Sequence, residues 1–378
     1  MTTPVVLHIA PISSRRQASG PFHAISGLVA GLHQQGCQVA LLTTGRATYD
    51  LAQPFPVFHH SDLGRPPDLS RCPPPFDTPD LVVFHSTYIP RQAYLAGQCR
   101  RRGIPYIITP HGGMTRGAQA IKPLKKRLGN LLFFSRMVRG AAAIHCLTVA
   151  EAADARAWGR PVFVVGNGVD LPPAASVATP AAKPGLRLLF VGRLDPHHKG
   201  LDLLIEACAL ASHRLRVARA SIAVHGPSIA GSAQALQRLA HERGLDDLLR
   251  VKGPVYGEDK ARAYAAVDLF LHTSRFEGHP MAVLEALSYG LPCLLTPGTN
   301  MADEVVAAGA GWRAEPTPQG IAGALVAAVE ARQHLAAMGQ RARQLVAERY
   351  TWGKVARALC EHYETIITSS PTGTAHKA

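Results

Sequence analysis

Two acidic residues, Glu277 and Glu285, stand eight positions apart in a segment that predicts a strand, a tight loop and a helix in succession. The apolar run 266–274 predicts a buried strand, and residues 275–279 predict the loop. Pro280 suits the first position of the helix, where its fixed φ and its missing N–H cost nothing. Glu277 is therefore expected on the loop and Glu285 inside the helix, on either side of a helix N-terminus.

This helix N-terminus is itself a candidate binding site. The backbone N–H groups of Gly278, His279 and Met281 are predicted to point away from it, where an oxygen-rich or anionic ligand binds well. With one acid before the terminus and one after it, the segment could grip two parts of one polyhydroxylated ligand. The same pair of acids also suits general acid–base catalysis.

A second cluster lies where the predicted strand 186–191 ends. Its loop carries Arg193 and Lys199, and a helix is predicted to begin at Gly200. Two cations beside a helix N-terminus form a clamp for a diphosphate. The alternative is surface charge on an ordinary loop.

Two further features lie in the first half of the chain. A predicted strand at 106–109 leads into His111, and the glycines that follow allow backbone to approach a ligand closely. A lone histidine is more often structural, but the carboxyl end of a strand favours a functional role for this one. The loop after the first strand ends at Gly20 and could offer backbone N–H groups to a phosphate.

Short apolar strands alternate with amphipathic helices along the whole chain, which is typical of parallel α/β sheets. Strands are predicted at 5–9, 38–43, 80–85, 106–109, 142–146, 162–165, 186–191, 221–224, 249–252, 266–274 and 293–296. The predicted division is an N-terminal domain over 1–175, a linker over 176–186, a C-terminal domain over 187–350, a helix over 351–368 that could return to the N-terminal domain, and a disordered tail over 369–378. Two such α/β domains are expected to hold their ligands at the carboxyl ends of the strands, in a cleft between them.

The net charge of +14 is concentrated in the first half of the chain. Residues 1–150 carry sixteen Lys/Arg and five Asp/Glu, and no acid occurs between Asp80 and Glu151. This asymmetry indicates an anionic partner for the first half, with a merely solvated basic surface as the alternative. The seven cysteines form no CxxC pair and are interpreted as reduced thiols of a cytoplasmic protein. Neither a leader peptide nor a membrane-spanning run is predicted.

The segment 122–139 reads as a basic amphipathic helix. Ile121, Leu124, Leu128, Leu131 and Val138 follow one helical stripe, and most of the lysines and arginines lie off it. Together with the basic residues from Arg100 onward, this predicts that residues 100–139 contact an anionic membrane surface. The equally weighted alternative is that the stripe packs into the core of the N-terminal domain.

Several competing motifs are absent from the sequence. There is no Asp-x-Asp pair for a metal-dependent sugar transferase, no GxGxxG after the first strand and no GxSxG. These absences argue against a metal site, a dinucleotide oxidoreductase and a serine hydrolase. No nucleic-acid partner is expected.

Taken together, these residues resemble the retaining, nucleotide-sugar-dependent glycosyltransferases of the GT-B fold, specifically the large family 4 group. Glu277 and Glu285 match its E-x7-E motif, Arg193 and Lys199 match its diphosphate-binding pair, and His111 with Gly112 matches its N-domain histidine motif. The resemblance runs from about residue 5 to 363 and is strongest over 187–312.

The resemblance implies a role for each residue. Glu285 would bind ribose hydroxyls, while Glu277 and the N–H groups after it would bind the donor sugar. Arg193, Lys199 and the Gly20 backbone would bind the diphosphate, His111 would contact the sugar near the reacting carbon, and the turn ending at Val255 would lie against the base. His111 and Glu277 are the residues given a catalytic share.

The expected activity is therefore a metal-independent transfer of sugar, with retention, from a UDP- or GDP-linked donor to a saccharide or lipid-linked acceptor, without a cofactor. Cell-surface polysaccharide or glycolipid synthesis in the cytoplasm, with peripheral attachment at the inner membrane, is the expected setting. Two alternatives stay open: a nucleotide-sugar-binding protein without transferase activity, and a phosphorylase or epimerase on the same fold.

Overall fold

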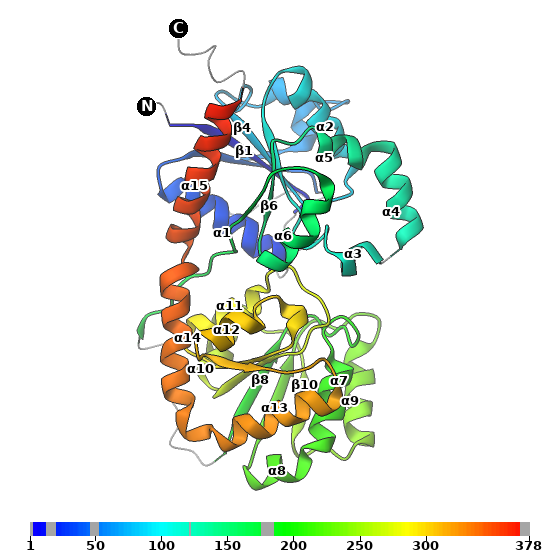
Figure 1. Cartoon of the computed structure of the whole chain (residues 1–378), viewed down its shortest axis with the longest axis vertical. Helices are drawn as coiled ribbons and strands as arrows, with labels where there is room; N and C mark the ends of the chain where they lie inside the picture. The colour runs from blue at the N-terminus through cyan, green and yellow to red at the C-terminus, as the bar shows by residue number, and fades with distance from the viewer. Residues whose placement is uncertain (1–2, 13–19, 46–52, 121, 175–184, 371–378) are drawn as a thin grey trace. The chain divides into compact units, whose positions relative to one another are not determined.

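The chain divides into two compact units, of which unit 1 comprises Met1–Gly168 with Trp352–Ala378 and unit 2 comprises Val169–Thr351. The computed structural model describes residues 3–12, 20–45, 53–120, 122–174 and 185–370 (Figure 1). The division falls after Gly168, not after residue 175 as expected, because the Val169 N–H donates to the Tyr350 carbonyl at 2.7 Å and ties this segment to unit 2. Most of the predicted linker, and residues 371–378 of the predicted tail, lie outside the described ranges.

Unit 1 is built on a seven-stranded parallel sheet with the strand order β3-β2-β1-β4-β5-β6-β7. Its strands are β1 (Val5–Ala10), β2 (Gln38–Thr43), β3 (Val57–His59), β4 (Leu81–His85), β5 (Tyr106–Thr109), β6 (Ala143–Cys146) and β7 (Val162–Val164). Since β1 pairs with both β2 and β4, the chain changes direction across the sheet at the β1–β4 boundary. Ligands of open parallel sheets bind at such a switch point.

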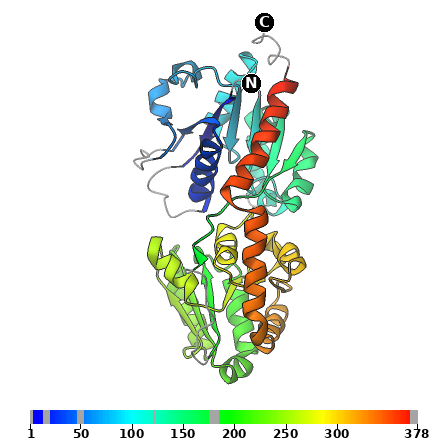
Figure 2. The ribbon, with the colours of Figure 1, turned by 90° about the vertical axis from the view of Figure 1, so that its left-hand side faces the viewer.

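Helices cover both faces of this sheet, so alternate residues of each strand enter two different cores. Helices α1 (Gly20–Gln34) and α15 (Trp352–Ser369) pack against one face and lie against each other (Figure 2). Helices α2 (Pro90–Arg101), α5 (Ser135–Arg139) and α6 (Val149–Ala155) pack against the other face.

The start of α15 is held in unit 1 by Trp352, whose ring fills space left open by glycines. A Cβ on Gly27 of α1 would come within 2.2 Å of this ring, and a Cβ on Gly168 within 2.3 Å. The absence of side chains at these two positions therefore creates the seat for Trp352.

We expect Gly27→Ala to lower the melting temperature of the protein, although alanine normally stabilises a helix interior relative to glycine by about 0.5–1 kcal/mol. The added methyl overpacks the Trp352 seat, at a cost of about 1–3 kcal/mol. Gly97→Ala in α2 is the matched control, because the nearest heavy atoms to a Cβ there are flexible arginine ends at 3.8 Å. Calorimetry should show a lower melting temperature for Gly27→Ala and an unchanged or higher one for Gly97→Ala. An equal increase in the melting temperature of both variants would contradict the packing of Trp352 against Gly27.

The segment 122–139 differs from the continuous amphipathic helix that was predicted. It consists of α4 (Pro123–Gly129), a π-helical segment (Asn130–Phe134) and α5, and the short α3 (Arg116–Ala120) precedes it. The π segment shifts the register of the stripe, so Val138 is buried in the core while Leu124, Leu128 and Leu131 are exposed. The prediction that the stripe packs into the core is thus correct only for Val138. Ile121 lies outside the described residues.

Unit 2 is built on a six-stranded parallel sheet with the order β10-β9-β8-β11-β12-β13. Its strands are β8 (Arg187–Val191), β9 (Ser221–His225), β10 (Leu249–Lys252), β11 (Leu269–His272), β12 (Cys293–Leu295) and β13 (Gly311–Arg313). Here β8 lies between β9 and β11, so the switch point lies at the β8–β11 boundary.

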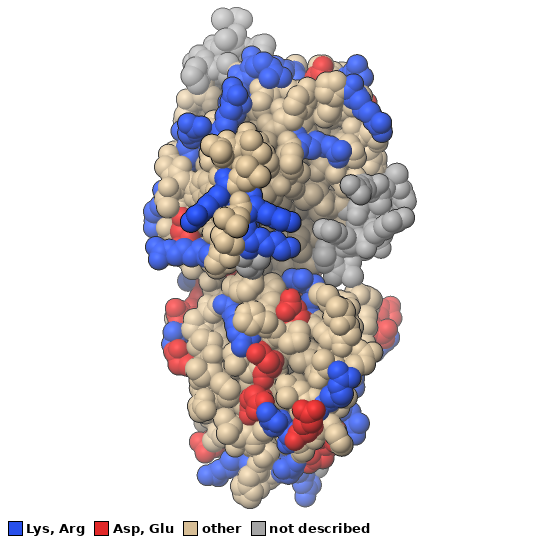
Figure 3. Space-filling view, turned by 90° about the vertical axis from the view of Figure 1, so that its right-hand side faces the viewer, with Lys and Arg blue, Asp and Glu red and all other residues tan. Residues whose placement is uncertain are grey.

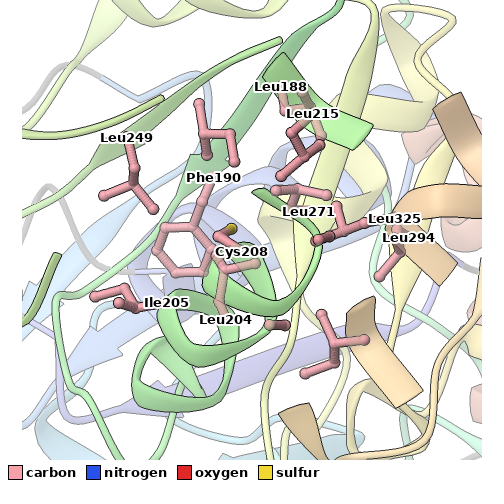
Figure 4. Close-up of a cluster of buried hydrophobic side chains, with 14 of the residues drawn as sticks. Leu188, Phe190, Leu204, Ile205, Cys208, Leu215, Leu249, Leu271, Leu294 and Leu325 are labelled. Carbon is pink, nitrogen blue, oxygen red and sulfur yellow. The ribbon is translucent and has the colours of Figure 1, made fainter. Parts of the chain in front are cut away.

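Helices also cover both faces of the second sheet. One face packs against α7 (Leu201–Leu210), α8 (Ser212–Val217), α9 (Ser232–Glu242) and α13 (Pro318–Glu330). Figure 4 shows this core, in which the Phe190 ring lies among leucine and isoleucine side chains from the sheet and the helices. The other face packs against α10 (Gly257–Ala265), α11 (Met281–Ser288), α12 (Ala302–Ala307) and α14 (Leu335–Arg349).

The predicted α/β class, with two Rossmann-like domains, is confirmed. The strands predicted from apolar runs are present within about two residues, except that the run 266–274 contributes only the four residues of β11. The edge strands β3 and β13 were not predicted, since three half-exposed residues give no readable periodicity. Among the described residues, 3₁₀ turns occur at His60–Leu63, Leu69–Arg71, Arg156–Trp158, Pro297–Thr299 and Arg332–His334, among others. All seven cysteines are free thiols. Within the described ranges, every helix is too short or too polar to cross a bilayer.

Candidate active site

The loops that follow β8 and β11 meet at the switch point of unit 2 and carry both predicted clusters. Hydrogen bonds to backbone carbonyls join the two loops. The Thr273 hydroxyl donates to the carbonyls of Lys199 and Gly200, each at 3.1 Å, and the Arg275 N–H donates to the His198 carbonyl. Gly200 has a φ of +61°, and a Cβ there would lie 2.1 Å from the Thr273 carbonyl oxygen. Only glycine satisfies both conditions, so this position fixes how closely the two loops approach.

Glu277 and Lys199 form an ion pair at this junction, with both side chains nearly buried. The same carboxylate oxygen, Oε1, also accepts from the Ser274 hydroxyl at 2.7 Å and from His272 Nε2 at 3.2 Å. Oε2 has no protein partner among the described residues. Glu277 is thus anchored through one oxygen, which leaves the other to accept a hydrogen bond from a ligand hydroxyl.

The ionisation state of this cluster follows from its surroundings. Burial raises the pKa of Glu277, but the Lys199 ammonium and the His272 ring outweigh it and hold that pKa well below its ordinary value. Burial lowers the pKa of His272 despite the nearby carboxylate. Glu277 is therefore a carboxylate at neutral pH, which suits a hydrogen-bond acceptor and not a general acid.

Arg193 is exposed, and its guanidinium lies beside the His198 ring. The His198 ring stacks on Phe276 at 4.1 Å, and its Nε2–H donates to the Phe276 carbonyl at 2.8 Å. Nδ1 of His198 is then an acceptor, and Arg193 Nη2 lies 3.4 Å from it. Arg193 forms no ion pair with any carboxylate of the described chain, so its charge is available to an anion.

Glu285 lies on α11, where both of its oxygens are bonded. Lys260 Nζ donates to Oε1 at 2.7 Å, and the Tyr264 hydroxyl donates to Oε2 at 2.9 Å. Each carboxylate oxygen has further lone pairs, so the pair of ribose hydroxyls expected here could still bind. Neither Lys260 nor Tyr264 was singled out from the sequence. One helical turn separates them on α10, which places both on the face that meets α11.

The segment between the two acids is held from one side by Asn300. Its amide donates to the carbonyl of Glu277 at 2.7 Å and to that of Gly278 at 3.1 Å. Helix α11 begins at Met281, with Pro280 as its N-cap, one residue later than predicted. The N–H groups at the very start of α11 precede its first intrahelical hydrogen bond, as at any helix N-terminus, and a ligand at this end stays a prediction.

The other predicted donor contacts are placed as follows. His279 is buried against the Tyr350 ring at 5.3 Å, and burial lowers its pKa to about 4, so the ring is neutral. Val255 is half-buried against the core beneath α10 and α11. Gly20 is the exposed first residue of α1 in unit 1, and residues 13–19 before it lie outside the described ranges.

His111 follows β5 in unit 1 and has a left-handed backbone, with φ of +49°. This conformation is uncommon for a residue with a side chain and marks a local constraint. His111 lies in a turn that is closed by a hydrogen bond from the Gly113 N–H to the Pro110 carbonyl at 3.0 Å. Beside this turn, Glu151 is a fully buried carboxylate that accepts from the N–H groups of Gly112 at 2.5 Å and Leu147 at 2.8 Å. Nothing in the local sequence pattern pointed to Glu151, which lies 40 positions after His111.

Comparison with known proteins shows which family has this sequence and architecture. Residues 19–168 match the glycosyl transferase 4-like domain, and residues 176–345 match the model described as glycosyl transferases group 1. D-inositol 3-phosphate glycosyltransferase of Frankia alni is 30% identical over 325 residues, which cover 78% of this chain and 74% of that protein. The chain belongs to the group 1 glycosyltransferase family. It is a glycosyltransferase with the GT-B fold, as the resemblance implied.

Solved structures agree on the fold of this glycosyltransferase. HepE of Anabaena, determined in complex with UDP, has a TM-score of 0.74 at 17% identity and covers 96% of this chain and 100% of its own. Sucrose-phosphate synthase of Thermosynechococcus elongatus has a TM-score of 0.72 at 17% identity, with 97% and 100% covered. At this level of identity the likeness concerns the fold alone.

Proposed function

We propose that this glycosyltransferase moves a sugar, with retention and without a metal, from a UDP- or GDP-linked donor to a saccharide or lipid-linked acceptor in cell-surface polysaccharide or glycolipid synthesis. The observation that carries the proposal is the junction in unit 2, where a nearly buried carboxylate with one open oxygen adjoins Lys199 and an Arg193 that pairs with no acid of the described chain. That combination suits one ligand with hydroxyl groups at one end and a diphosphate at the other. The complex of HepE with UDP is consistent with such a donor.

In this proposal the residues of unit 2 divide the donor among them. Glu277 Oε2 accepts from a sugar hydroxyl, Glu285 accepts from the ribose, and Arg193 with Lys199 neutralises the departing diphosphate. Electrostatic stabilisation of the charge that develops on the leaving group usually contributes most to catalysis of such a reaction. In the proposed reaction the acceptor attacks on the face that the diphosphate leaves, and the phosphate oxygen takes the acceptor proton. No cofactor is required.

The function is tested by release of nucleoside diphosphate from a panel of UDP- and GDP-sugars. The acceptors should include free saccharides, lipid-linked saccharides and inositol phosphate, because the name of the Frankia relative specifies D-inositol 3-phosphate. Acceptor-dependent release in the presence of EDTA is the expected result. Binding without turnover would favour a nucleotide-sugar-binding protein, dependence on inorganic phosphate would favour a phosphorylase, and conversion of the donor sugar alone would favour an epimerase.

The basic surface of unit 1 supports peripheral contact with an anionic membrane. Leu124, Leu128, Leu131 and Leu132 are exposed by 76%, 56%, 83% and 66%, although they lie within nine positions of one another. On the face shown in Figure 3, lysine and arginine side chains gather beside uncharged ones in unit 1. The exposed cations of this segment are Lys122, Lys125, Arg127, Arg136 and Arg139. Each basic residue near an anionic bilayer contributes about 1 kcal/mol, and the leucines add apolar burial.

Lys126 departs from this arrangement. Its Nζ donates to the Ala118 carbonyl and lies 5.7 Å from the centroid of the Tyr88 ring. Lys126 thus ties α4 to its surroundings and contributes less to the basic surface than its neighbours do.

We predict that the wild-type protein co-sediments with phosphatidylglycerol vesicles at low salt and is released as salt rises. Leu128→Ser combined with Leu131→Ser should weaken this binding about tenfold or more. Full burial of one leucine side chain contributes about 1.5–3 kcal/mol, so even partial insertion of two leucines accounts for this loss. The matched control is Leu210→Ser with Val217→Ser in unit 2, which removes two side chains that are similarly exposed, by 60% and 71%. Absence of wild-type binding at low salt, or equal loss in both double variants, would contradict a membrane role for this surface.

A further inference from the structure

Three histidines form a hydrogen-bonded line through unit 1 that ends at His111. His8 lies in β1, His85 ends β4 and His111 follows β5, and these strands are neighbours in the sheet. His8 Nδ1 is 2.9 Å from His85 Nε2, and His85 Nδ1 is 2.9 Å from His111 Nε2. His8 and His85 share the face of the sheet that α1 and α15 cover, because both alternate with residues of the opposite core.

All three imidazoles are neutral at physiological pH. Burial, with a smaller effect of His145, lowers the pKa of His8 and that of His111 to about 3 each, and burial lowers the pKa of His85 well below its ordinary value. A neutral ring carries one N–H, so three rings joined by two N–H···N bonds allow only two proton arrangements. In one, every proton lies on Nδ1; in the other, every proton lies on Nε2.

The inner end of the line discriminates between these arrangements. His8 is fully buried, and its Nε2 has no hydrogen-bond partner among the described residues. A proton on this atom would be an orphaned buried N–H, which folded proteins rarely contain, whereas an unmet acceptor is better tolerated. The Tyr363 hydroxyl, on a ring 6.2 Å from that of His8, also lacks a partner within the described chain, and a hydroxyl proton complements a bare nitrogen.

We propose that His8 and His85 are positioning residues that hold His111 in its Nδ1–H tautomer. His8 Nδ1–H donates to His85 Nε2, and His85 Nδ1–H donates to His111 Nε2. His111 then presents Nδ1–H as a hydrogen-bond donor, which suits an oxygen atom of the donor sugar. This last step rests on the proposed glycosyltransferase function and on the contact between His111 and the sugar that the family resemblance implies.

His111, at the outer end of the line, is placed so that its Nδ1–H can donate a hydrogen bond to a ligand. His111 is only half-buried, and its Nε2 is the nitrogen occupied by His85. The left-handed backbone at His111, braced through Gly112 by Glu151, fixes the direction of the ring from the other side. Both the orientation and the proton of His111 are therefore specified by groups that do not themselves reach the surface.

The tautomer can be measured directly by long-range ¹H–¹⁵N correlation on protein labelled with ¹⁵N-histidine, because protonated and bare ring nitrogens have well-separated ¹⁵N shifts. His111→Ala identifies the His111 signals by their disappearance. We expect a protonated Nδ1 and a bare Nε2 at His111 in the wild type. A protonated Nε2 there would overturn the proposal, whatever the activity measurements give.

Two substitutions of His85 then test the relay. His85→Phe keeps the ring volume but removes both hydrogen bonds, so His111 should shift towards a tautomer mixture and kcat/KM should fall by about 10- to 100-fold, the range typical of partners that orient a functional histidine. His85→Asn retains a donor near Nδ1 and should keep the wild-type His111 spectrum and a kcat/KM close to that of the wild type. An unchanged His111 spectrum in His85→Phe would overturn the proposal.

The same experiments separate this inference from the proposed function. If His111→Ala turns over normally while the His111 tautomer is fixed as expected, the relay stands and the contact with the sugar is wrong. If the tautomer is reversed while His111→Ala is inactive, the relay is wrong and the contact with the sugar stands.

Discussion

Lys199→Ala should lower kcat about 100- to 1,000-fold, the loss typical when one group that stabilises developing charge in the transition state is removed. Its ammonium is nearly buried at the junction of the β8 and β11 loops, where it pairs with Glu277. At this low-exposure site its charge would act on the leaving diphosphate of the proposed donor with little screening by water. The substitution also leaves the Glu277 carboxylate with only Ser274 and His272 as partners within the described chain, so the pKa of Glu277 should rise.

Initial rates of nucleoside diphosphate release measure this effect. Lys354→Ala is the control for loss of one lysine charge, because Lys354 is exposed on α15 in unit 1. Circular dichroism should confirm that both variants fold. Wild-type rates in Lys199→Ala, with the fold intact, would remove Lys199 from the proposed site.

The second large effect is expected from Glu277→Gln, which should lower kcat/KM about 100-fold or more. Oε1 accepts three hydrogen bonds, so the amide oxygen of glutamine must replace it. The NH₂ group then replaces Oε2, which turns the acceptor proposed for a sugar hydroxyl into a donor. Lys199 also loses its counter-charge in a nearly buried position, and breaking a pair in this way costs more than the pair itself contributes.

The pH profile gives an independent check on Glu277. Because its pKa lies well below its ordinary value, the carboxylate stays ionised as pH falls through the ordinary range near 4.5. Any loss of wild-type activity between pH 7 and pH 5 must then come from another group. Glu277→Gln should retain the shape of the wild-type profile over this interval at a lower rate. If the substitution abolished an acidic limb between pH 5 and pH 7, the assignment of Glu277 as a permanent acceptor would be wrong.

Much of the fold could be predicted because its strands are buried on both faces. Runs such as those of β1 and β8 are apolar at almost every position, which is the pattern of a covered parallel strand. The three-residue edge strands gave no such pattern. The segment after Lys122 was predicted only in outline, because the π segment that shifts the register of its stripe depends on packing and not on hydrophobic period.

In the candidate site, too, some residues could be predicted from the sequence and others could not. Residues that follow a strand and precede a helix, such as Arg193, Lys199 and Glu277, could be selected by position and residue type. Their partners could not, because they are fixed by tertiary contact: Lys260 meets Glu285 across two helices, and Glu151 reaches Gly112 from 39 positions away. In the sequence, His8 and His85 resemble ordinary strand residues, and only the order β1-β4-β5 in the sheet aligns them with His111.

The configuration of the new glycosidic bond is the decisive measurement for the proposed metal-independent transfer with retention. With the donor identified from the nucleotide-sugar panel, ¹H NMR of the product formed during the first turnovers reports the anomeric configuration before any rearrangement. We expect a transferred sugar with the same configuration as in the donor, formed in the presence of EDTA and lost in Lys199→Ala. A product of inverted configuration, or transfer that is abolished by EDTA, would contradict the proposed reaction.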